Sequence, residues 1–392
     1  MSSPFAFRST ALFRSTLALL VGAVATLIAQ SAARADDPDP VAAVITRLRV
    51  QEAPQPVRER PQWRAPHKVV LLAFANSRGW PGREAAFAAV APKVQVVVAK
   101  DMAAAITATA DADAIIGFNP EICVSKLIDN AKQLRWIASL AAGVENCMAV
   151  PGVRGRNLLL TNMRGVDAPI IAEHAIAMAM ALSHGLDTFA VDTSKGVWSV
   201  EHGATTPIQT LDEKTLLVVG LGGIGTEVAI RAYGLGMKVI ATRDNKRDKP
   251  EFVSYVGLPD ELLTLAKSAD VIVNSVPLTP QTTGMYDAKF FAVLKPTAYF
   301  INVARGASAV TADLVSALNE HRLAGAGLDV VEPEPLPADN PLWHAPHVII
   351  TPHISARTDL PSEARWTLAV ENLRRYANGE KMLSVVDLAK GY

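Results

Sequence analysis

A glycine-rich turn between an apolar strand and a helix constrains the fold of this chain more than any other feature. The apolar run 216–219 is followed at once by glycines at 220, 222 and 225, and a helix-like segment comes next. Gly220 permits a tight turn, Gly222 lets a ligand approach the backbone, and Gly225 lets helix and strand pack closely. The N–H groups that begin such a helix bind phosphate. With a second apolar strand at 238–242, the pattern predicts a dinucleotide site. The residues expected to line it are Gly220, Gly222, Gly223, Ile224 and Gly225.

The end of the second strand indicates which dinucleotide binds. An Asp or Glu about 20 residues after the glycines would bond the adenosine ribose and repel a 2′-phosphate. Arg243 occupies that position here, with Lys246 and Arg247 close behind it, and a guanidinium can pair with phosphate. Asp244, one place later, could instead turn inward and bond the ribose. We predict NADP(H), with NAD(H) as the alternative.

The remaining chain alternates apolar runs of strand length with helix-like segments. The expected strands before the glycine turn are 68–74, 94–99, 114–118, 136–140 and 158–161, with helices at 83–90 and 121–130. A second strand–helix series begins at 215 and ends near 350. This alternation is typical of parallel sheets covered on both faces. Between the two series lie an apolar helix, 170–182, expected to be buried, and a polar stretch, 185–210, broken by glycine and proline.

Composition argues against two classes of site. Lys and Arg together number 38, as do Asp and Glu, so the chain has no basic field with which to collect nucleic acid. Cys123 and Cys147 are the two cysteines, and they lack the paired spacing of a metal site. We therefore expect neither nucleic acid nor metal. The cysteines could form one disulfide in an exported protein, or be two buried small apolar residues.

The N-terminus has the pattern of an export signal. Arg8 and Arg14 precede an uncharged, apolar run, and small residues at 33 and 35 come before a polar segment. This order predicts a signal peptide, 1–35, cleaved after Ala35, and an N-terminal extension, 36–66, with at most one short helix near 41–50. We expect an exported, periplasmic protein without a membrane span. The alternatives are an uncleaved anchor, or a start codon placed too far upstream in a cytoplasmic protein.

Three residues suited to acid–base and anion chemistry follow strands of the second series. Arg305 comes after the apolar run 299–304, Glu334 after 325–331 and His353 after 348–350. Ligands of open α/β sheets lie beyond the carboxyl ends of the strands. An arginine there can anchor a carboxylate and a carbonyl oxygen, a histidine can donate a proton, and a carboxylate can orient the histidine. The set fits the reduction of a keto acid. Glu332 is the alternative to Glu334, and His174, in the apolar helix, is expected to be a satisfied core group.

With these motifs, the chain resembles the D-isomer-specific 2-hydroxyacid dehydrogenases, a family that includes glyoxylate and hydroxypyruvate reductases. The resemblance spans roughly residues 68–388 and rests on the glycine turn and on segments 302–306, 328–337 and 351–354. It implies an α/β fold of two Rossmann-like/flavodoxin-like domains with parallel sheets and an active site in the interdomain cleft. The expected boundaries are 67–165 for the substrate (catalytic) domain, 166–350 for the NAD(P)-binding Rossmann domain and 351–392 for the C-terminal return to the substrate domain.

The resemblance also implies roles for individual residues. Arg305 would bind the substrate, His353 would be the acid–base group with Glu334 as its partner, and Asp329 would bond the nicotinamide carboxamide. Backbone N–H groups of a loop that matches 141–145 would bind the substrate carboxylate; Glu145 stands where that loop usually has Asp, a change expected to matter little. The substrate contacts expected are Ala142, Gly143, Val144 and Arg305, and the further cofactor contacts are Pro277, Thr282 and Val303. A homodimer is expected.

The predicted function is hydride transfer between NAD(P)H and a small 2-keto or D-2-hydroxy acid. One alternative is a phosphite- or formate-type dehydrogenase of the same superfamily. Formate enzymes carry Gln in place of the catalytic Glu, so Glu334 argues against them, whereas phosphite oxidation keeps the same three residues. The other alternative is a non-catalytic, nucleotide-sensing protein with an idle site.

Overall fold

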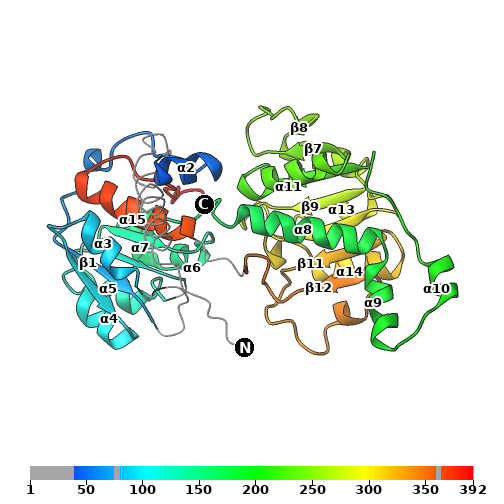
Figure 1. Ribbon diagram of the computed structural model, residues 1–392, viewed down its shortest axis with the longest axis horizontal. Coiled ribbons are helices and arrows are strands. Elements are labelled where there is room, and N and C mark those ends of the chain that lie inside the picture. Colours follow the sequence, from blue (N-terminus) through cyan, green and yellow to red (C-terminus); the bar gives the residue numbers. More distant parts are fainter. Residues whose placement is uncertain (1–38, 75–79, 81, 120, 359–362, 392) are drawn as a thin grey trace, which may run out of the picture. The chain divides into compact units, whose positions relative to one another are not determined.

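The computed structural model describes residues 39–74, 80, 82–119, 121–358 and 363–391, and residues 44–391 belong to one compact unit. Two parallel β-sheets organise this unit (Figure 1). The predicted signal peptide lies outside the described residues. The predicted fold of two α/β domains with parallel sheets is confirmed.

The first sheet has five parallel strands in the order β2-β1-β3-β4-β5. Each strand coincides with an apolar run of the sequence, because both of its faces are covered by helices or loops. The strands are β1 (Lys68–Leu72), β2 (Gln95–Ala99), β3 (Ala114–Gly117), β4 (Trp136–Ser139) and β5 (Leu159–Thr161). The helices of this domain are α3 (Glu84–Val90), α4 (Met102–Thr109), α5 (Ser125–Asn130), α6 (Glu145–Met148), α7 (Pro151–Gly155) and α15 (Glu363–Asn378).

The helix predicted at 121–130 starts later than expected. It begins at Ser125, because the backbone of Val124 is extended. Cys123, two residues before the helix, forms a disulfide with Cys147. The Cα atoms of the two cysteines are 4.6 Å apart, within the range that a disulfide spans. Of the two interpretations of the cysteines, the paired one is therefore correct.

The segment predicted as an extension contributes to the core of the first domain. It contains α2 (Pro40–Arg47) and the short 3-10 helix η1 (Val57–Glu59). The side chains of Val50 and Val57 are buried together with Trp136 and Tyr376, and the Val57 amide donates to the Glu380 carbonyl at 2.8 Å. Residues 44–66 are thus an integral part of this domain.

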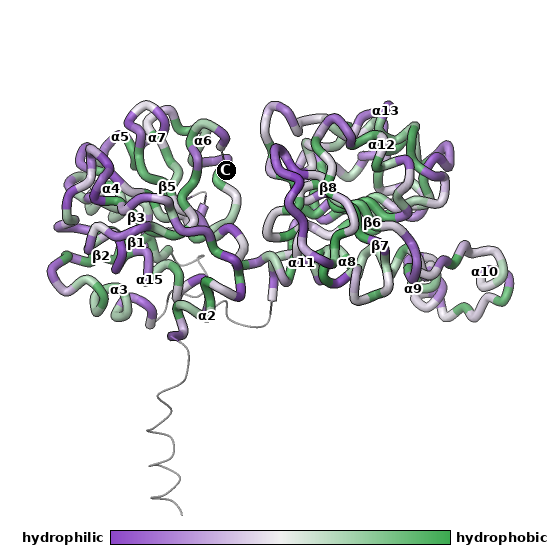
Figure 2. Tube along the Cα trace, turned by 90° about the horizontal axis from the view of Figure 1, so that it is seen from above, coloured by the Kyte–Doolittle hydropathy of each residue, from purple (hydrophilic) through white to green (hydrophobic). Residues whose placement is uncertain are grey.

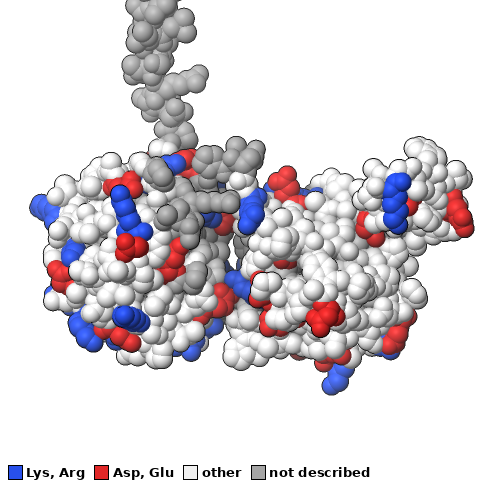
Figure 3. Space-filling view, turned by 90° about the horizontal axis from the view of Figure 1, so that it is seen from below, with Lys and Arg blue, Asp and Glu red and all other residues white. Residues whose placement is uncertain are grey.

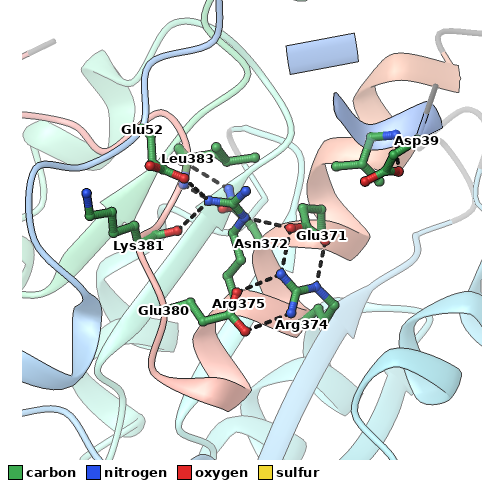
Figure 4. A network of polar contacts seen from close by, with 10 residues as sticks. Asp39, Glu52, Glu371, Asn372, Arg374, Arg375, Glu380, Lys381 and Leu383 are labelled. Carbon is green, nitrogen blue, oxygen red and sulfur yellow. Dashed lines mark hydrogen bonds and ion pairs between the residues drawn. The ribbon is translucent and has the colours of Figure 1, made fainter. Parts of the chain in front are cut away.

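An ion-pair network connects that segment to the C-terminal helix α15 (Figure 4). Glu371, which is buried, accepts hydrogen bonds from Arg374 and Arg375. Arg374 also bonds Glu380, and Arg375 also bonds Glu52. Burial alone raises the pKa of the Glu371 carboxyl, but the hydrogen bonds from the two arginines outweigh burial, so its pKa is lowered. Arg375, which Glu371 holds in place, therefore joins α15 to Glu52.

The second sheet has seven parallel strands in the order β12-β11-β10-β9-β6-β7-β8. They are β6 (Thr215–Val219), β7 (Lys238–Thr242), β8 (Tyr255–Gly257), β9 (Val271–Asn274), β10 (Tyr299–Asn302), β11 (Gly325–Leu328) and β12 (Val348–Ile350). The chain leaves β6 toward β7 and β8, then crosses back to β9 on the other side. Ligands of such sheets bind at this reversal of strand order, which is where the glycine turn follows β6.

Helices cover both faces of the second sheet (Figure 1). The long apolar helix α8 (Ala168–Ser183) and α11 (Gly223–Gly234) pack on one face through a shared apolar core, as the sequence predicted for α8. The opposite face carries α12 (Leu262–Ala266), α13 (Ala288–Ala292) and α14 (Thr311–Asn319). Three 3-10 helices complete this domain: η2 (Pro259–Glu261), η3 (Gly306–Ser308) and η4 (Pro341–His344).

The polar stretch after α8 contains two helices that the sequence did not predict, α9 (Leu186–Ser194) and α10 (Val200–Thr205). Figures 1 and 2 both show α10 standing away from the other elements of its domain. Apolar side chains are exposed along this segment, which we call the arm (186–208). They are Leu186, Val191, Val197, Trp198, Val200 and Ile208.

The surface of the described residues carries mixed charge. On the face drawn in Figure 3, Lys and Arg alternate with Asp and Glu. No helix within the described ranges has both the length and the apolar character needed to cross a bilayer.

Candidate active site

The glycine turn after β6 has the geometry that a dinucleotide requires. Gly220 has a φ of +93°, a left-handed conformation that favours glycine. A Cβ on Gly222 would meet no atom within 4 Å, so a ligand can approach the backbone there. A Cβ on Gly225 would lie 2.7 Å from Val218 Cγ1 and 2.8 Å from Ser275 Oγ, so only glycine lets α11 pack this closely on β6. With Gly223 and Ile224 opening α11, the residues fit a bound pyrophosphate.

Three further residues predicted to contact the cofactor lie after β9 and β10. Pro277 and Thr282 belong to one loop, in which the Thr282 hydroxyl donates to the Pro277 carbonyl at 2.7 Å and accepts from the Thr279 amide. Thr282 therefore shapes this loop. Val303, directly after β10, is buried. All three follow strands adjacent to or near β6 at the carboxyl edge of the sheet.

Arg243 comes directly after β7 and is held by a neighbouring carboxylate. Its Nη1 atom donates to Asp248 Oδ2 at 2.8 Å and to the Asp248 carbonyl at 3.1 Å. Arg247 is engaged elsewhere, with Tyr255 and Glu261, and Asp244 is exposed. Arg243 is thus the arginine at the strand end, and Asp248 is a partner that the sequence did not identify.

The loop 141–144 after β4 is built to present backbone N–H groups. Asn162 Nδ2 donates to the Ala142 carbonyl and Asn119 Nδ2 to the Gly143 carbonyl, both at 2.7 Å. Among the described residues, the N–H groups of Ala142, Gly143 and Val144 find no acceptor. A short run of unsatisfied N–H groups is suited to an anion. Sequence reasoning found the loop but missed Asn119 and Asn162, whose only signal was their place beyond β3 and β5.

Arg305 lies two residues beyond Val303 and reaches the same loop. Its Nε donates to Glu145 Oε1 at 2.9 Å, and Nη1 donates to its own neighbour, the Ala304 carbonyl, at 2.6 Å. The Nη2 atom lies so close to Gly143 that a Cβ there would overlap it. The guanidinium and the loop together therefore offer a cation beside unsatisfied N–H groups. The contact with Glu145 gives that residue a role in holding Arg305 that the sequence did not predict.

Glu334 and His353 form the pair that the sequence predicted. His353 Nδ1 lies 2.8 Å from Glu334 Oε2, and Glu334 Oε1 accepts from the Val331 amide. The structure places Glu334, rather than Glu332, against the histidine. With Nδ1 engaged, Nε2 is the imidazole atom left for a substrate. Glu334 follows β11, which pairs with β10, the strand before Arg305, and His353 follows β12, which pairs with β11.

Asp329 organises the backbone around His353. The carboxylate is 1% exposed and accepts from the Ile354 amide at 2.8 Å, the Ser355 amide at 3.0 Å and the Thr351 hydroxyl at 2.6 Å. Burial raises the pKa of this carboxyl, but the hydrogen bonds from Ser355, Thr351 and Ile354 outweigh it, so the pKa is lowered. Asp329 is therefore a carboxylate at neutral pH.

No group of three or more His, Cys, Asp or Glu suited to a metal ion occurs in the part of the chain that the structure describes. The polar groups that the structure places beyond β4, β10, β11 and β12 are the loop 142–144, Arg305, Glu334 and His353.

Comparison with known proteins identifies the family. Residues 176–355 match the family model for D-isomer specific 2-hydroxyacid dehydrogenase, NAD binding domain. The chain is 34% identical over 275 residues to a glyoxylate reductase from Thermococcus litoralis, which covers 69% of this chain and 82% of that protein. It is 31% identical over 274 residues to glyoxylate/hydroxypyruvate reductase A from Photorhabdus laumondii, covering 68% of this chain and 84% of that protein.

A solved structure agrees with this result. An NADPH-dependent glyoxylate/hydroxypyruvate reductase from Sinorhizobium meliloti, in complex with NADP and sulfate, matches with a TM-score of 0.70 and 26% identity, over 83% of this chain and 100% of that chain. The resemblance noted from the motifs is confirmed. The chain belongs to the D-isomer-specific 2-hydroxyacid dehydrogenase family and is an NAD(P)-dependent oxidoreductase that transfers a hydride between its cofactor and a 2-keto or 2-hydroxy acid.

Proposed function

We propose that this enzyme reduces small 2-keto acids such as glyoxylate or hydroxypyruvate to the D-alcohol. The observation that carries the proposal is the position of the Arg305 guanidinium against the loop 142–144, whose N–H groups find no acceptor among the described residues. A cation and several N–H donors together match a carboxylate with an adjacent carbonyl oxygen. The printed activities of the Thermococcus and Photorhabdus relatives support this substrate class.

The residues divide the chemistry among them. When bound, the cofactor supplies a hydride from its nicotinamide ring. The amides of 142–144 and Arg305 bind the substrate carboxylate, and Arg305 also faces the carbonyl oxygen on which negative charge develops. His353 Nε2 donates a proton to that oxygen. Glu334, bonded to Nδ1 at 2.8 Å, orients the ring and stabilises the imidazolium before transfer.

A panel of keto acids tests the proposal. Purified protein that binds NADPH is mixed with glyoxylate, hydroxypyruvate, pyruvate and larger 2-keto acids, and NADPH oxidation is followed. The expected result is turnover with the small substrates. Turnover with none of the 2-keto acids by a folded, cofactor-binding protein would contradict it, and phosphite-dependent reduction of NADP or NAD would favour the phosphite alternative.

NADP(H) is proposed as the preferred cofactor. Arg243 can meet a 2′-phosphate with a planar donor fork, whereas Asp248 competes with the phosphate for the same Nη1 atom. The solved S. meliloti relative, which binds NADP, supports this choice. An Asp244 carboxylate turned toward the ribose would instead favour NAD(H).

Exchange of Arg243 should reverse the cofactor preference. We expect Arg243→Asp to favour NADH, with a change in discrimination of roughly 10- to 150-fold, because a charge-assisted contact with phosphate contributes about 1.5–3 kcal/mol. Asp248→Asn is the matched companion, since it frees the guanidinium and should lower KM for NADPH alone. The measurement is kcat/KM with each cofactor. Better use of NADH than NADPH by the wild type would assign the ribose to Asp244.

A homodimer is proposed through the arm. Trp198 is 94% exposed and Val200 is 76% exposed, and an apolar cluster of this kind on a soluble domain marks an interaction surface. We expect Trp198→Asp to convert a dimer to monomer in sedimentation equilibrium, while a substitution of exposed Lys195 leaves it dimeric. A monomeric wild type at micromolar concentration would refute the proposal.

Export to the periplasm is also proposed. It rests on the charged, apolar and small-residue order of residues 8–35 in the sequence, and the Cys123–Cys147 disulfide supports it because disulfides persist in oxidising compartments. N-terminal sequencing of protein from the native cell should find Asp36 as the first residue. A chain that begins at Met1 or Ser2 would show that the segment is not removed.

A further inference from the structure

A partly buried chain of hydrogen bonds runs from helix α8 to the loop that carries the catalytic histidine. His174 Nε2 lies 3.0 Å from the Thr351 hydroxyl, and that hydroxyl donates to Asp329 Oδ1 at 2.6 Å. Asp329 in turn accepts the amides of Ile354 and Ser355. From its place in the apolar helix, His174 was expected to be a satisfied core group, and the reaction described above does not use it.

The donor and the acceptor of each of these hydrogen bonds follow from the number of protons available. A hydroxyl has one proton, and a carboxylate can only accept. Because the Thr351 proton is committed to Asp329, the contact with His174 requires Nε2 to be the donor. His174 therefore carries a proton on Nε2, and this N–H restricts the Thr351 hydroxyl to one orientation.

Asp329 in turn holds the backbone at His353. Its carbonyl accepts the His353 amide at 2.9 Å, while its carboxylate holds the next two amides. His353 itself has a φ of +52°, a left-handed conformation that is uncommon for residues other than glycine. Such a conformation persists only where the surroundings enforce it, and here Asp329 supplies the surrounding contacts on both sides of the residue.

We propose that His174 is a positioning residue for the catalytic loop: its Nε2–H fixes the Thr351 hydroxyl on Asp329, and Asp329 fixes the backbone of His353. The kinetic part of this proposal rests on the proposed role of His353 as the proton donor. The hydrogen-bond part of the proposal does not depend on that role. His174 Nε2 bonds the Thr351 hydroxyl and lies 3.8 Å from Asp329 Oδ1, so it acts on His353 through these two residues.

Four variants test the chain by removing or keeping single donors. His174→Gln keeps an N–H close to the position of Nε2, and His174→Leu keeps the size without the donor. Thr351→Val removes the hydroxyl while keeping the shape, and the double variant His174→Leu/Thr351→Val removes both. His184→Leu, at the exposed end of the same helix, is the matched control.

The expected result is a loss in kcat with the keto-acid KM retained, since Arg305 and the loop 142–144 are untouched. His174→Leu and Thr351→Val should each lower kcat about tenfold, as for a hydrogen bond within a charged network. His174→Gln should recover most of this loss. The double variant should be no slower than the worse single variant, because both changes break one chain. His184→Leu should match the wild type.

Two outcomes would overturn the proposal. If His174→Gln were as slow as His174→Leu, the ring would act by packing. If the losses of the two single variants added in the double variant, the residues would act independently.

The tautomer of His174 tests the hydrogen bonds without reference to activity. Imidazole nitrogen chemical shifts in 15N-labelled protein should show Nε2–H for His174 in the wild type and a changed spectrum in Thr351→Val. An Nδ1–H tautomer would contradict the inference even in an active enzyme. An enzyme inactive on every keto acid but with the Nε2–H tautomer would instead contradict the proposed function alone.

Discussion

Arg305→Ala is expected to lower kcat/KM for keto acids by roughly 10²- to 10³-fold, the size of the loss when one donor to a developing oxyanion is removed. KM should rise and kcat should fall, because the guanidinium binds the carboxylate in the ground state and faces the carbonyl oxygen in the transition state. The loss has a second physical cause. Without Arg305, the Glu145 carboxylate loses its partner at 2.9 Å and repels the incoming anion.

Two further variants separate these causes. Arg305→Lys keeps the positive charge but not the planar fork. Compared with Arg305→Ala, it should therefore have a lower KM but only a slightly higher kcat. In the double variant Arg305→Ala/Glu145→Gln, the repulsion is gone, and KM should fall below that of Arg305→Ala. Steady-state kinetics with glyoxylate and hydroxypyruvate provide both numbers. An Arg305→Ala enzyme with kcat/KM near that of the wild type would remove Arg305 from the site.

His353→Ala is expected to lose kcat by roughly 100-fold or more, the contribution of a positioned general acid. The keto-acid KM should change little, because the carboxylate is held by Arg305 and by the amides of 142–144. The binding of NADPH, followed by its fluorescence, should also be retained. A fall in cofactor affinity in parallel with kcat would mean that the substitution has disturbed the loop held by Asp329.

Glu334→Gln isolates the charge next to the histidine. The amide retains an acceptor for the Val331 amide and remains beside Nδ1, but it no longer stabilises an imidazolium. We expect kcat to fall by roughly 10- to 150-fold, from about 1.5–3 kcal/mol for a hydrogen bond to a charged group. The matched control is Glu332→Gln, whose side chain has no contact with His353 among the described hydrogen bonds, and which should behave as the wild type.

Local patterns in the sequence were sufficient to predict the sheets and the glycine turn. Strands buried on both faces are apolar, so runs such as 216–219 mark them directly. The requirement for glycine at 220 and 225 is equally local, since it comes from one turn and one helix–strand contact. By contrast, β8 consists of an exposed tyrosine, one valine and a glycine, and α9 and α10 leave apolar side chains exposed, so none of the three gives a clear periodic signal.

The side chains that we propose as catalytic could be predicted because each follows a strand in a specific motif, whereas the residues that support them could not. Glu145 and Arg305 are 160 residues apart, and Asn162 reaches the Ala142 carbonyl from a different strand end. Such contacts arise only once the sheet sets the distances between loops. The pairing of Cys123 with Cys147 is of the same kind: the sequence allowed two interpretations, and the structure has the two cysteines joined in a disulfide.

The transfer of a labelled hydride tests the central claim most directly. The enzyme is given hydroxypyruvate and NADPH that carries deuterium at the transferring position of the nicotinamide ring, and the glycerate formed is analysed by mass spectrometry and by chiral chromatography. We expect one deuterium on carbon 2 and the D-enantiomer, with no product from Arg305→Ala on the same time scale. Unlabelled glycerate, or glycerate of the L-configuration, would contradict the assignment of this chain as a hydride-transferring D-2-hydroxyacid dehydrogenase.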